Sequence, residues 1–191
     1  MFQSLYDRVL GWSRHRHAQR YLAGLSFAEA TVFPIPPDVM LIPMVLAERD
    51  SAWRLATVTT LSSVLGGLLG YLIGWFGIET VLPVIERAGY IAGYDAAVDA
   101  FDRWGVWFVM LAGFTPIPFK VVTIAAGALG APLAGFLVGA FAGRGGRFYL
   151  VSGIIFAGGR QVADHLRRWV DLAGWLMIAV IFVGGLLWWL V

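Results

Sequence analysis

The sequence contains no cysteine, few charged residues and little histidine. Without cysteine, the chain can form no disulfide and offers neither a thiolate nucleophile nor a Cys-ligated metal site. Charged residues make up 14% of the chain, whereas a soluble domain averages about 25%. The net charge of +2 is small, and no run of basic residues interleaved with aromatic residues indicates a nucleic-acid groove. We therefore expect no nucleic-acid partner.

The sequence also lacks the usual signatures of catalysis. All three histidines, His15, His17 and His165, lie in basic segments, so we expect no metal site. No Ser–His arrangement suits an intramembrane serine protease, and no glycine-rich nucleotide loop follows a strand. These absences favour transport over hydrolysis or redox chemistry. We expect that the protein is not an enzyme and uses no cofactor.

Apolar residues are abundant. They make up 59% of the chain, against about 45–50% in a soluble domain. A soluble fold of this size cannot bury so much apolar surface, whereas a bilayer is itself an apolar solvent. The 24 glycines and nine tryptophans agree with this, because Gly is common in membrane helices and Trp collects at membrane interfaces. The composition predicts an all-α integral membrane protein.

Two apolar segments, residues 21–47 and residues 105–131, are interrupted by proline. An interior proline removes a backbone hydrogen bond and clashes with the preceding helical turn. We therefore predict that each segment forms a re-entrant hairpin rather than a straight spanning helix. The hairpin breaks are formed by five prolines: Pro34, Pro36, Pro37, Pro116 and Pro118.

Each predicted hairpin is followed by an apolar run long enough to span a bilayer, residues 55–78 and residues 132–157. In the first of these runs, Gly66, Gly70 and Gly74 recur at four-residue spacing, which would let another helix pack closely. The chain therefore contains two copies of one predicted unit, a broken hairpin followed by a spanning helix.

The remaining segments are assigned by charge. Residues 1–20 are basic and amphipathic and predict an interfacial helix on the cytoplasmic headgroups, with a disordered basic tail as the alternative. They do not resemble a cleavable signal peptide. Residues 79–104 are acidic and predict an external amphipathic segment. Residues 158–170 predict a basic cytoplasmic loop, and residues 171–191 a C-terminal spanning helix.

The positive-inside rule places the basic segments in the cytoplasm and the acidic segment outside. With residues 55–78 crossing outward, the first hairpin enters and leaves on the cytoplasmic side and the second on the outside. The two units are then inverted copies, as in many transporters, with a cytoplasmic N-terminus and an external C-terminus. If residues 21–47 crossed fully, the basic loop at 158–170 would lie outside, so the charge distribution favours the re-entrant arrangement.

Charged residues inside the predicted membrane segments are the candidate functional groups, because such a charge costs roughly 2.5–3.5 kcal/mol on insertion scales. Glu29, in the first hairpin, would face a cavity or exchange a proton, unless it reaches the headgroups. Asp38 follows the first break and would be a functional acid, a helix N-cap or both. Lys120, in the matching position after the second break, would pair with an acid, bind a phosphate or extend outward.

Arg144 and Arg147 interrupt the second predicted span and lie one helical turn apart on one face. Two guanidinium groups in a span need partners, and a phosphate headgroup or the carboxylates of Glu29 and Asp38 would serve. In the alternative interpretation the helix is short and both arginines lie at its cytoplasmic end.

Two proline-containing motifs resemble those of the DedA superfamily, also called VTT-domain or SNARE-associated-Golgi-like proteins, and in particular its YqaA-like branch. They run from Glu29 to Asp38 and from Gly113 to Lys120, with a glycine-rich span between them and Gly127 after them. The second motif departs from the family pattern, because it begins Ala112-Gly113-Phe114 rather than Gly-Arg-Phe. Lys120 also lies one position from the usual arginine.

The resemblance implies a bacterial inner-membrane protein with two opposed re-entrant hairpins. Members of this family are implicated in moving polyprenyl phosphates or phospholipids across the bilayer in dependence on the proton gradient. The implied partners are membrane lipids with an anionic phosphate headgroup, and protons. Whether the protein forms a homo-oligomer is left open. The implied substrate- and proton-binding residues are Glu29, Asp38, Lys120, Arg144 and Arg147.

Together, the residues and the resemblance predict a lipid translocase or scramblase-like transporter. In this interpretation the basic residues bind the headgroup phosphate, and the two acids compete for them or exchange protons. Two alternatives stay open, a small-solute or cation/proton antiporter that uses the same acids, and a non-transporting scaffold for membrane-protein assembly.

Overall fold

All regular secondary structure in the described part of the chain is helical, as the composition predicts. The computed structural model describes residues 15, 17–31, 33, 35–87, 91–115 and 119–159. Several predicted features lie outside these residues: segment 171–191, nearly all of 158–170, most of 1–20, and Pro34, Pro116 and Pro118.

The first half of the described chain contains a helix, a break, a short helix and a long helix. These are α2 (Ala18–Glu29), α3 (Asp38–Ala47) and α4 (Ala52–Arg87), with the 3-10 turn η1 (Arg49–Ser51) before α4. We call residues 30–37 the first break. The helix ends here because proline lacks an amide hydrogen and disfavours a helical conformation in the residue before it.

The second half has the same order of elements. α5 covers Ile91–Phe114, α6 covers Phe119–Ala128, and residues 133–159 are helical. We call residues 115–118 the second break. The turn after α6 contains Gly130 with φ at 67°, a left-handed conformation that costs glycine little because it has no Cβ.

The acidic segment 79–104 is divided between two helices. Its first part continues α4 without interruption as far as Arg87, and its second part belongs to α5, which begins at Ile91. α4 also continues through Pro83, so this proline does not end the helix in the way that the first break ends α2.

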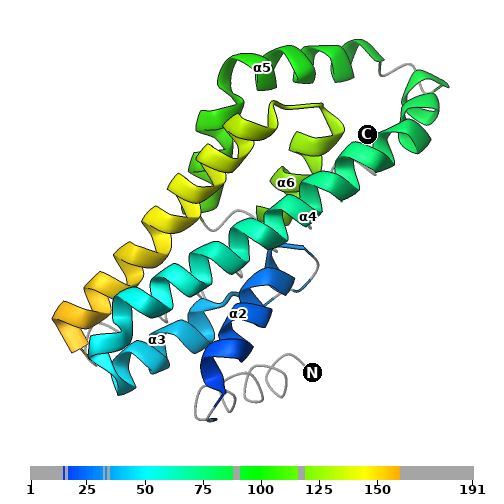
Figure 1. Cartoon of the computed structure of the whole chain (residues 1–191). Helices are drawn as coiled ribbons and strands as arrows, with labels where there is room; N and C mark the ends of the chain where they lie inside the picture. The colour runs from blue at the N-terminus through cyan, green and yellow to red at the C-terminus, as the bar shows by residue number, and fades with distance from the viewer. Residues whose placement is uncertain are drawn as a thin grey trace, which may run out of the picture.

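α4 is the central helix, and α2 and α6 both pack against it (Figure 1). A Cβ atom added to Gly66 would collide with the carbonyl oxygen of Phe27 in α2, and one added to Gly74 would collide with that of Ile124 in α6. The four-residue spacing of glycines therefore gives α4 a face that two other helix backbones approach closely, as the sequence indicated.

α4 is long enough to cross a bilayer, whereas α3 and α6 are not. Arg49–Thr80, 32 residues long, is the one segment in the described residues that has the length and hydropathy of a membrane span. At about 1.5 Å per residue it extends about 48 Å, against a hydrocarbon thickness of about 30 Å. α3 and α6 have ten residues each and extend only about 15 Å.

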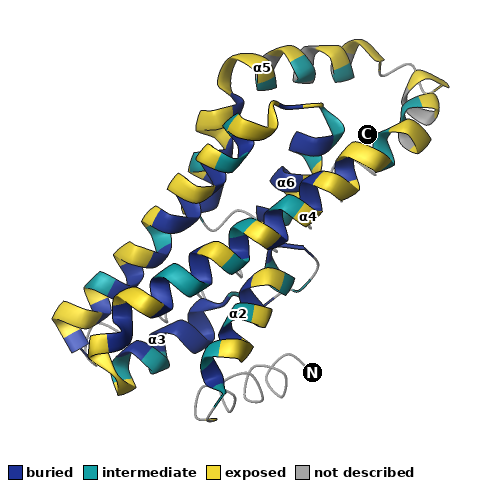
Figure 2. Cartoon of the chain, viewed as in Figure 1, coloured by how far each residue is buried: buried dark blue, intermediate teal, exposed yellow. Residues whose placement is uncertain are grey.

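Much of the outer surface is apolar. Figure 2 shows exposed residues along the outer faces of α4, α5 and the helix over 133–159. They include Phe76, Trp104 and Val138, whose exposed fractions are 72%, 66% and 63%. A continuous surface of this kind is unusual for a soluble monomer and is suited to contact with lipid.

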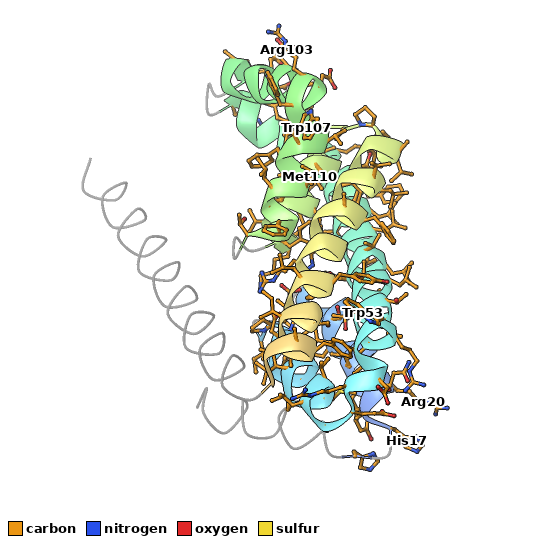
Figure 3. The ribbon with its side chains drawn as sticks, turned by 90° about the vertical axis from the view of Figure 1, so that its left-hand side faces the viewer. His17, Arg20, Trp53, Arg103, Trp107 and Met110 are labelled. Atoms are coloured by element: carbon orange, nitrogen blue, oxygen red, sulfur yellow. The ribbon has the colours of Figure 1, made fainter. Side chains whose placement is uncertain are left out.

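The buried apolar residues form two clusters, one toward each end of the bundle. The first joins α2, α3 and the start of α4 to residues 148–155, and the second joins α5, α6 and residues 131–140. Along the bundle, His17 and Arg20 lie at one end and Arg103 at the other, with Trp107 and Met110 between them (Figure 3). The charged residues predicted from the sequence lie where the two apolar clusters meet.

Candidate functional site

Five charged residues form the candidate site, and we call them the charge cluster. Glu29 is the last residue of α2, and Asp38 is the first residue of α3. Lys120 lies in the first turn of α6, and Arg144 and Arg147 lie near the middle of the helix over 133–159. The helix ends at the first break therefore bring both acids to the arginines, and the start of α6 brings Lys120 to the first break.

Two buried ion pairs join the halves of the protein. Nη2 of Arg144 donates a hydrogen bond to Oε2 of Glu29, and Nη2 of Arg147 donates one to Oδ2 of Asp38 at 2.8 Å. No side chain of either pair is more than 16% exposed. The sequence left open whether the arginines face acids or a phosphate, and in this structure their partners are the two acids.

Arg144 lies at the junction of the two apolar clusters. Its Nε donates to the Ser63 hydroxyl at 2.6 Å. Its guanidinium carbon lies 5.0 Å from the ring centre of Phe119 and 4.8 Å from that of Phe148, within cation–π range. Phe119 belongs to the second apolar cluster and Phe148 to the first. Arg144 therefore connects the two halves through its ion pair with Glu29, and the two apolar clusters through its ring contacts.

Two basic side chains reach backbone carbonyl groups at the breaks. Nη1 of Arg147 donates to the carbonyl oxygen of Thr115 at 3.1 Å, and Nζ of Lys120 donates to that of Phe33 at 3.5 Å. A carbonyl at a helix end has no helical partner, and in a bilayer it must find one within the protein. Lys120 takes part in none of the ion pairs in the described residues, so the predicted pairing with an acid is not found.

Asp38 is not the N-cap of α3, which corrects one interpretation of the sequence. Pro37 occupies the cap position with φ at −65° and ψ at −15°, and the side chain of Asp38 makes no capping hydrogen bond. A side chain caps a helix only from a residue with an extended backbone just before the first turn. Because the backbone of Pro37 is already helical, Asp38 lies inside the first turn. From there its carboxylate reaches Arg147. Its Oδ1 atom is buried and has no hydrogen-bond partner in the described part of the chain.

Sequence reasoning missed three uncharged members of the site: Ser63, Phe119 and Phe148. Helical spacing could have indicated two of them. Ser63 lies four residues before Gly67 and Phe148 lies four residues after Arg144, so the two residues of each pair share a helix face. A Cβ atom added to Gly67 would lie 3.0 Å from the Phe119 ring, so Ser63 and Gly67 share the face of α4 that meets this ring. For Phe119 the sequence offered only its position next to Lys120.

The comparisons with known proteins identify a domain and three relatives. The VTT domain matches residues 35–157. An uncharacterized protein of Haemophilus influenzae is 41% identical over 94% of both chains. Another uncharacterized protein, from Histophilus somni, is 38% identical over 96% of both chains. An uncharacterized protein of Methanocaldococcus jannaschii is 25% identical over 63% of this chain and 72% of its own length.

No solved structure matches the chain. The domain match begins at residue 35, within the first break and after Glu29, and it covers α3, α4, α5, the second break, α6 and the two arginines. The two bacterial relatives extend the similarity over nearly the whole chain. The chain therefore belongs to the VTT-domain family, the DedA/SNARE-associated family of membrane proteins.

Proposed function

We propose that the protein is a lipid translocase that moves a phosphate-bearing lipid, either a polyprenyl phosphate or a phospholipid, across the membrane. The observation that carries the proposal is the charge cluster. It contains three cations and two carboxylates, and both ion pairs are buried between the halves. The cluster therefore has one positive charge in excess. A single phosphate anion would neutralise it in a medium where an uncompensated charge is unfavourable.

We further propose that α2 with α3, and α5 with α6, are re-entrant hairpins of inverted orientation. A ten-residue helix extends about 15 Å, half the hydrocarbon thickness of about 30 Å, so a hairpin arm of this length would place its break near the midplane. Ligand sites of many transporters lie where broken helices of two inverted repeats meet. The contacts of Lys120 and Arg147 with break carbonyls support this arrangement.

The apolar outer surface supports a route in which only the headgroup needs the protein. The lipid tails would remain in the surrounding bilayer, next to exposed side chains such as Phe76 and Val138. The headgroup would pass along the charge cluster. Protonation of Asp38 would weaken its ion pair with Arg147 and let phosphate compete, and protonation of Glu29 would weaken the contact between the halves, so both would link translocation to the proton gradient.

The proposed topology can be tested by cysteine labelling, since the chain has no cysteine of its own. The proposal places the protein in the bacterial inner membrane with a cytoplasmic N-terminus and an external C-terminus. Arg20→Cys and Glu48→Cys should react with a membrane-impermeant reagent from the cytoplasmic side, and Arg103→Cys from the outside. Labelling of positions 20 and 48 from opposite sides would overturn the first re-entrant hairpin.

Reconstitution tests the function itself. Purified protein in liposomes should accelerate the crossing of a fluorescent phospholipid or polyprenyl phosphate, measured with and without a pH gradient. We expect Lys120→Gln to slow crossing about tenfold, because a hydrogen bond to a charged group is worth about 1.5–3 kcal/mol. Arg54→Gln is the control, because Arg54 lies outside the charge cluster, where its exposed side chain pairs with Glu48 at 3.8 Å and donates to the Ser51 hydroxyl at 3.0 Å.

Two outcomes would overturn the proposal. Cation-dependent loss of a pH gradient without lipid movement would indicate an antiporter. Neither lipid nor ion movement from correctly oriented, folded protein would indicate a scaffold.

A further inference from the structure

We infer that the two arginines of the charge cluster have different roles. Arg147 receives the headgroup phosphate, while Arg144 is a positioning residue that holds the two halves together. The inference rests on the proposed function and assigns its phosphate site to particular side chains. It follows from the different surroundings of two guanidinium groups that lie one helical turn apart.

Arg144 is enclosed by protein. Its side chain is 3% exposed, and two of its nitrogens donate hydrogen bonds to Ser63 and Glu29. The rings of Phe119 and Phe148 lie against its guanidinium group. These contacts come from α2, α4, α6 and its own helix. A phosphate could reach this guanidinium only by breaking contacts on which the packing of several helices depends.

Arg147 is more accessible, and its partners are simpler. Its side chain is 15% exposed. It donates to one carboxylate oxygen of Asp38 and to the carbonyl of Thr115. No aromatic ring lies over it in the described residues. A planar guanidinium with two terminal nitrogens and no ring stacked on it suits bidentate recognition of a phosphate.

Asp38 is the partner that a phosphate can displace most easily. One of its oxygens is held by Arg147 and the other is buried without a partner in the described part of the chain. A buried carboxylate in that state is incompletely satisfied. Exchange of Asp38 for phosphate breaks one hydrogen bond, whereas exchange at Arg144 disturbs two hydrogen bonds and two ring contacts.

Lys120 is positioned to supply the second positive charge of this site. Its ammonium group is half-buried, and among the described residues it donates only to the carbonyl of Phe33 at 3.5 Å, at the long end of the hydrogen-bond range. Phe33 belongs to the first break, five residues before Asp38. Lys120 and Arg147 therefore both contact the first break or the residue that follows it, from two different helices.

Two matched double variants test the inference: Asp38→Asn with Arg147→Gln, and Glu29→Gln with Arg144→Gln. Each removes one positive and one negative charge, so the net charge of the protein is unchanged. The binding probe is a fluorescent polyprenyl phosphate in detergent micelles, with the corresponding polyprenol as the phosphate-free control. The unfolding temperature is measured for each protein alongside the dissociation constant.

We expect the Asp38/Arg147 variant to bind the phosphate lipid at least about tenfold more weakly, because a charge-assisted bidentate contact is lost, with an unfolding temperature near that of the wild type. We expect the Glu29/Arg144 variant to unfold at a lower temperature, because it also loses the hydrogen bond to Ser63 and the two ring contacts. Its folded form should keep the wild-type affinity within about threefold, because its phosphate site is unchanged. If that variant does not fold, Phe148→Leu takes its place, because it removes one ring from Arg144. This variant should unfold at a lower temperature than the wild type and should bind the phosphate lipid with wild-type affinity, within the same limit.

The outcomes separate the two proposals. Wild-type protein that binds the phosphate lipid no better than the polyprenol would refute the proposed function. Wild-type protein that prefers the phosphate lipid leaves that function standing. In that case an equal loss of affinity in both double variants, or a larger loss in the Glu29/Arg144 variant, would refute the division of roles.

Discussion

The contact between α4 and α6 depends on a glycine whose replacement has a calculable effect. A Cβ atom at Gly74 would collide with the carbonyl oxygen of Ile124 and would lie 2.8 Å from the amide nitrogen of Ala128. Both are backbone atoms, so they cannot move aside as a flexible side chain could. Gly74→Ala therefore forces the two helices apart, and overpacking of this kind costs about 1–3 kcal/mol.

Gly77 provides the matched control, because it lies on the same helix less than one turn away and a Cβ atom there would meet nothing within 4 Å. Replacing glycine by alanine inside a helix gains about 1 kcal/mol from helix propensity in both variants. That gain cancels when the variants are compared. Gly74→Ala should therefore be about 1–3 kcal/mol less stable than Gly77→Ala.

The assay is equilibrium unfolding of purified protein in detergent micelles, followed by circular dichroism. Gly77→Ala should be as stable as the wild type or more stable, and Gly74→Ala should be less stable than Gly77→Ala by the stated difference. Equal stabilities of the two variants would show that α4 and α6 do not approach at Gly74, and would refute the packing described for the central helix.

Three further substitutions test the buried polar contacts by the same assay. Arg144→Ala leaves Glu29 without its partner and should cost about 3–5 kcal/mol. Arg54→Ala removes an exposed ion pair with Glu48 and a hydrogen bond to Ser51 and should cost about 1 kcal/mol, so equal costs would contradict the burial of the first pair. Tyr71→Phe removes a buried hydrogen bond of 2.6 Å to the carbonyl of Ala131 and should cost about 1–3 kcal/mol, so an unchanged stability would argue against that contact. Ser26→Ala removes the 2.7 Å bond to the carbonyl of Thr59 and should cost about 1 kcal/mol, and a stabilised variant would refute the reasoning.

The helix breaks could be predicted from the sequence because their cause is local. Proline constrains its own backbone and that of the preceding residue. α2 ends at Glu29, before the proline-containing segment, and α3 begins at Asp38, directly after Pro36 and Pro37. The continuation of α4 as far as Arg87 could not be predicted in this way. Charge indicated a change of environment after residue 78, but a helix can continue through such a change.

The members of the charge cluster could be predicted, but most of their pairing could not. A charged residue in an apolar segment is conspicuous in any sequence, and this feature singled out Glu29 and Arg144. Their contact joins residues 115 positions apart, and it depends on how α2 and the helix over 133–159 pack. The local rule for N-caps misplaced Asp38 by one position, because a proline in a helical conformation took the cap instead.

The most direct test of the account is the initial rate at which a phosphate-bearing lipid crosses a liposome membrane. The account predicts that wild-type protein accelerates the crossing of a fluorescent polyprenyl phosphate over protein-free liposomes. It also predicts that Asp38→Asn with Arg147→Gln removes at least about nine-tenths of this acceleration, which corresponds to about 1.4 kcal/mol. A wild-type rate equal to that of protein-free liposomes, or full activity in the double variant, would contradict it.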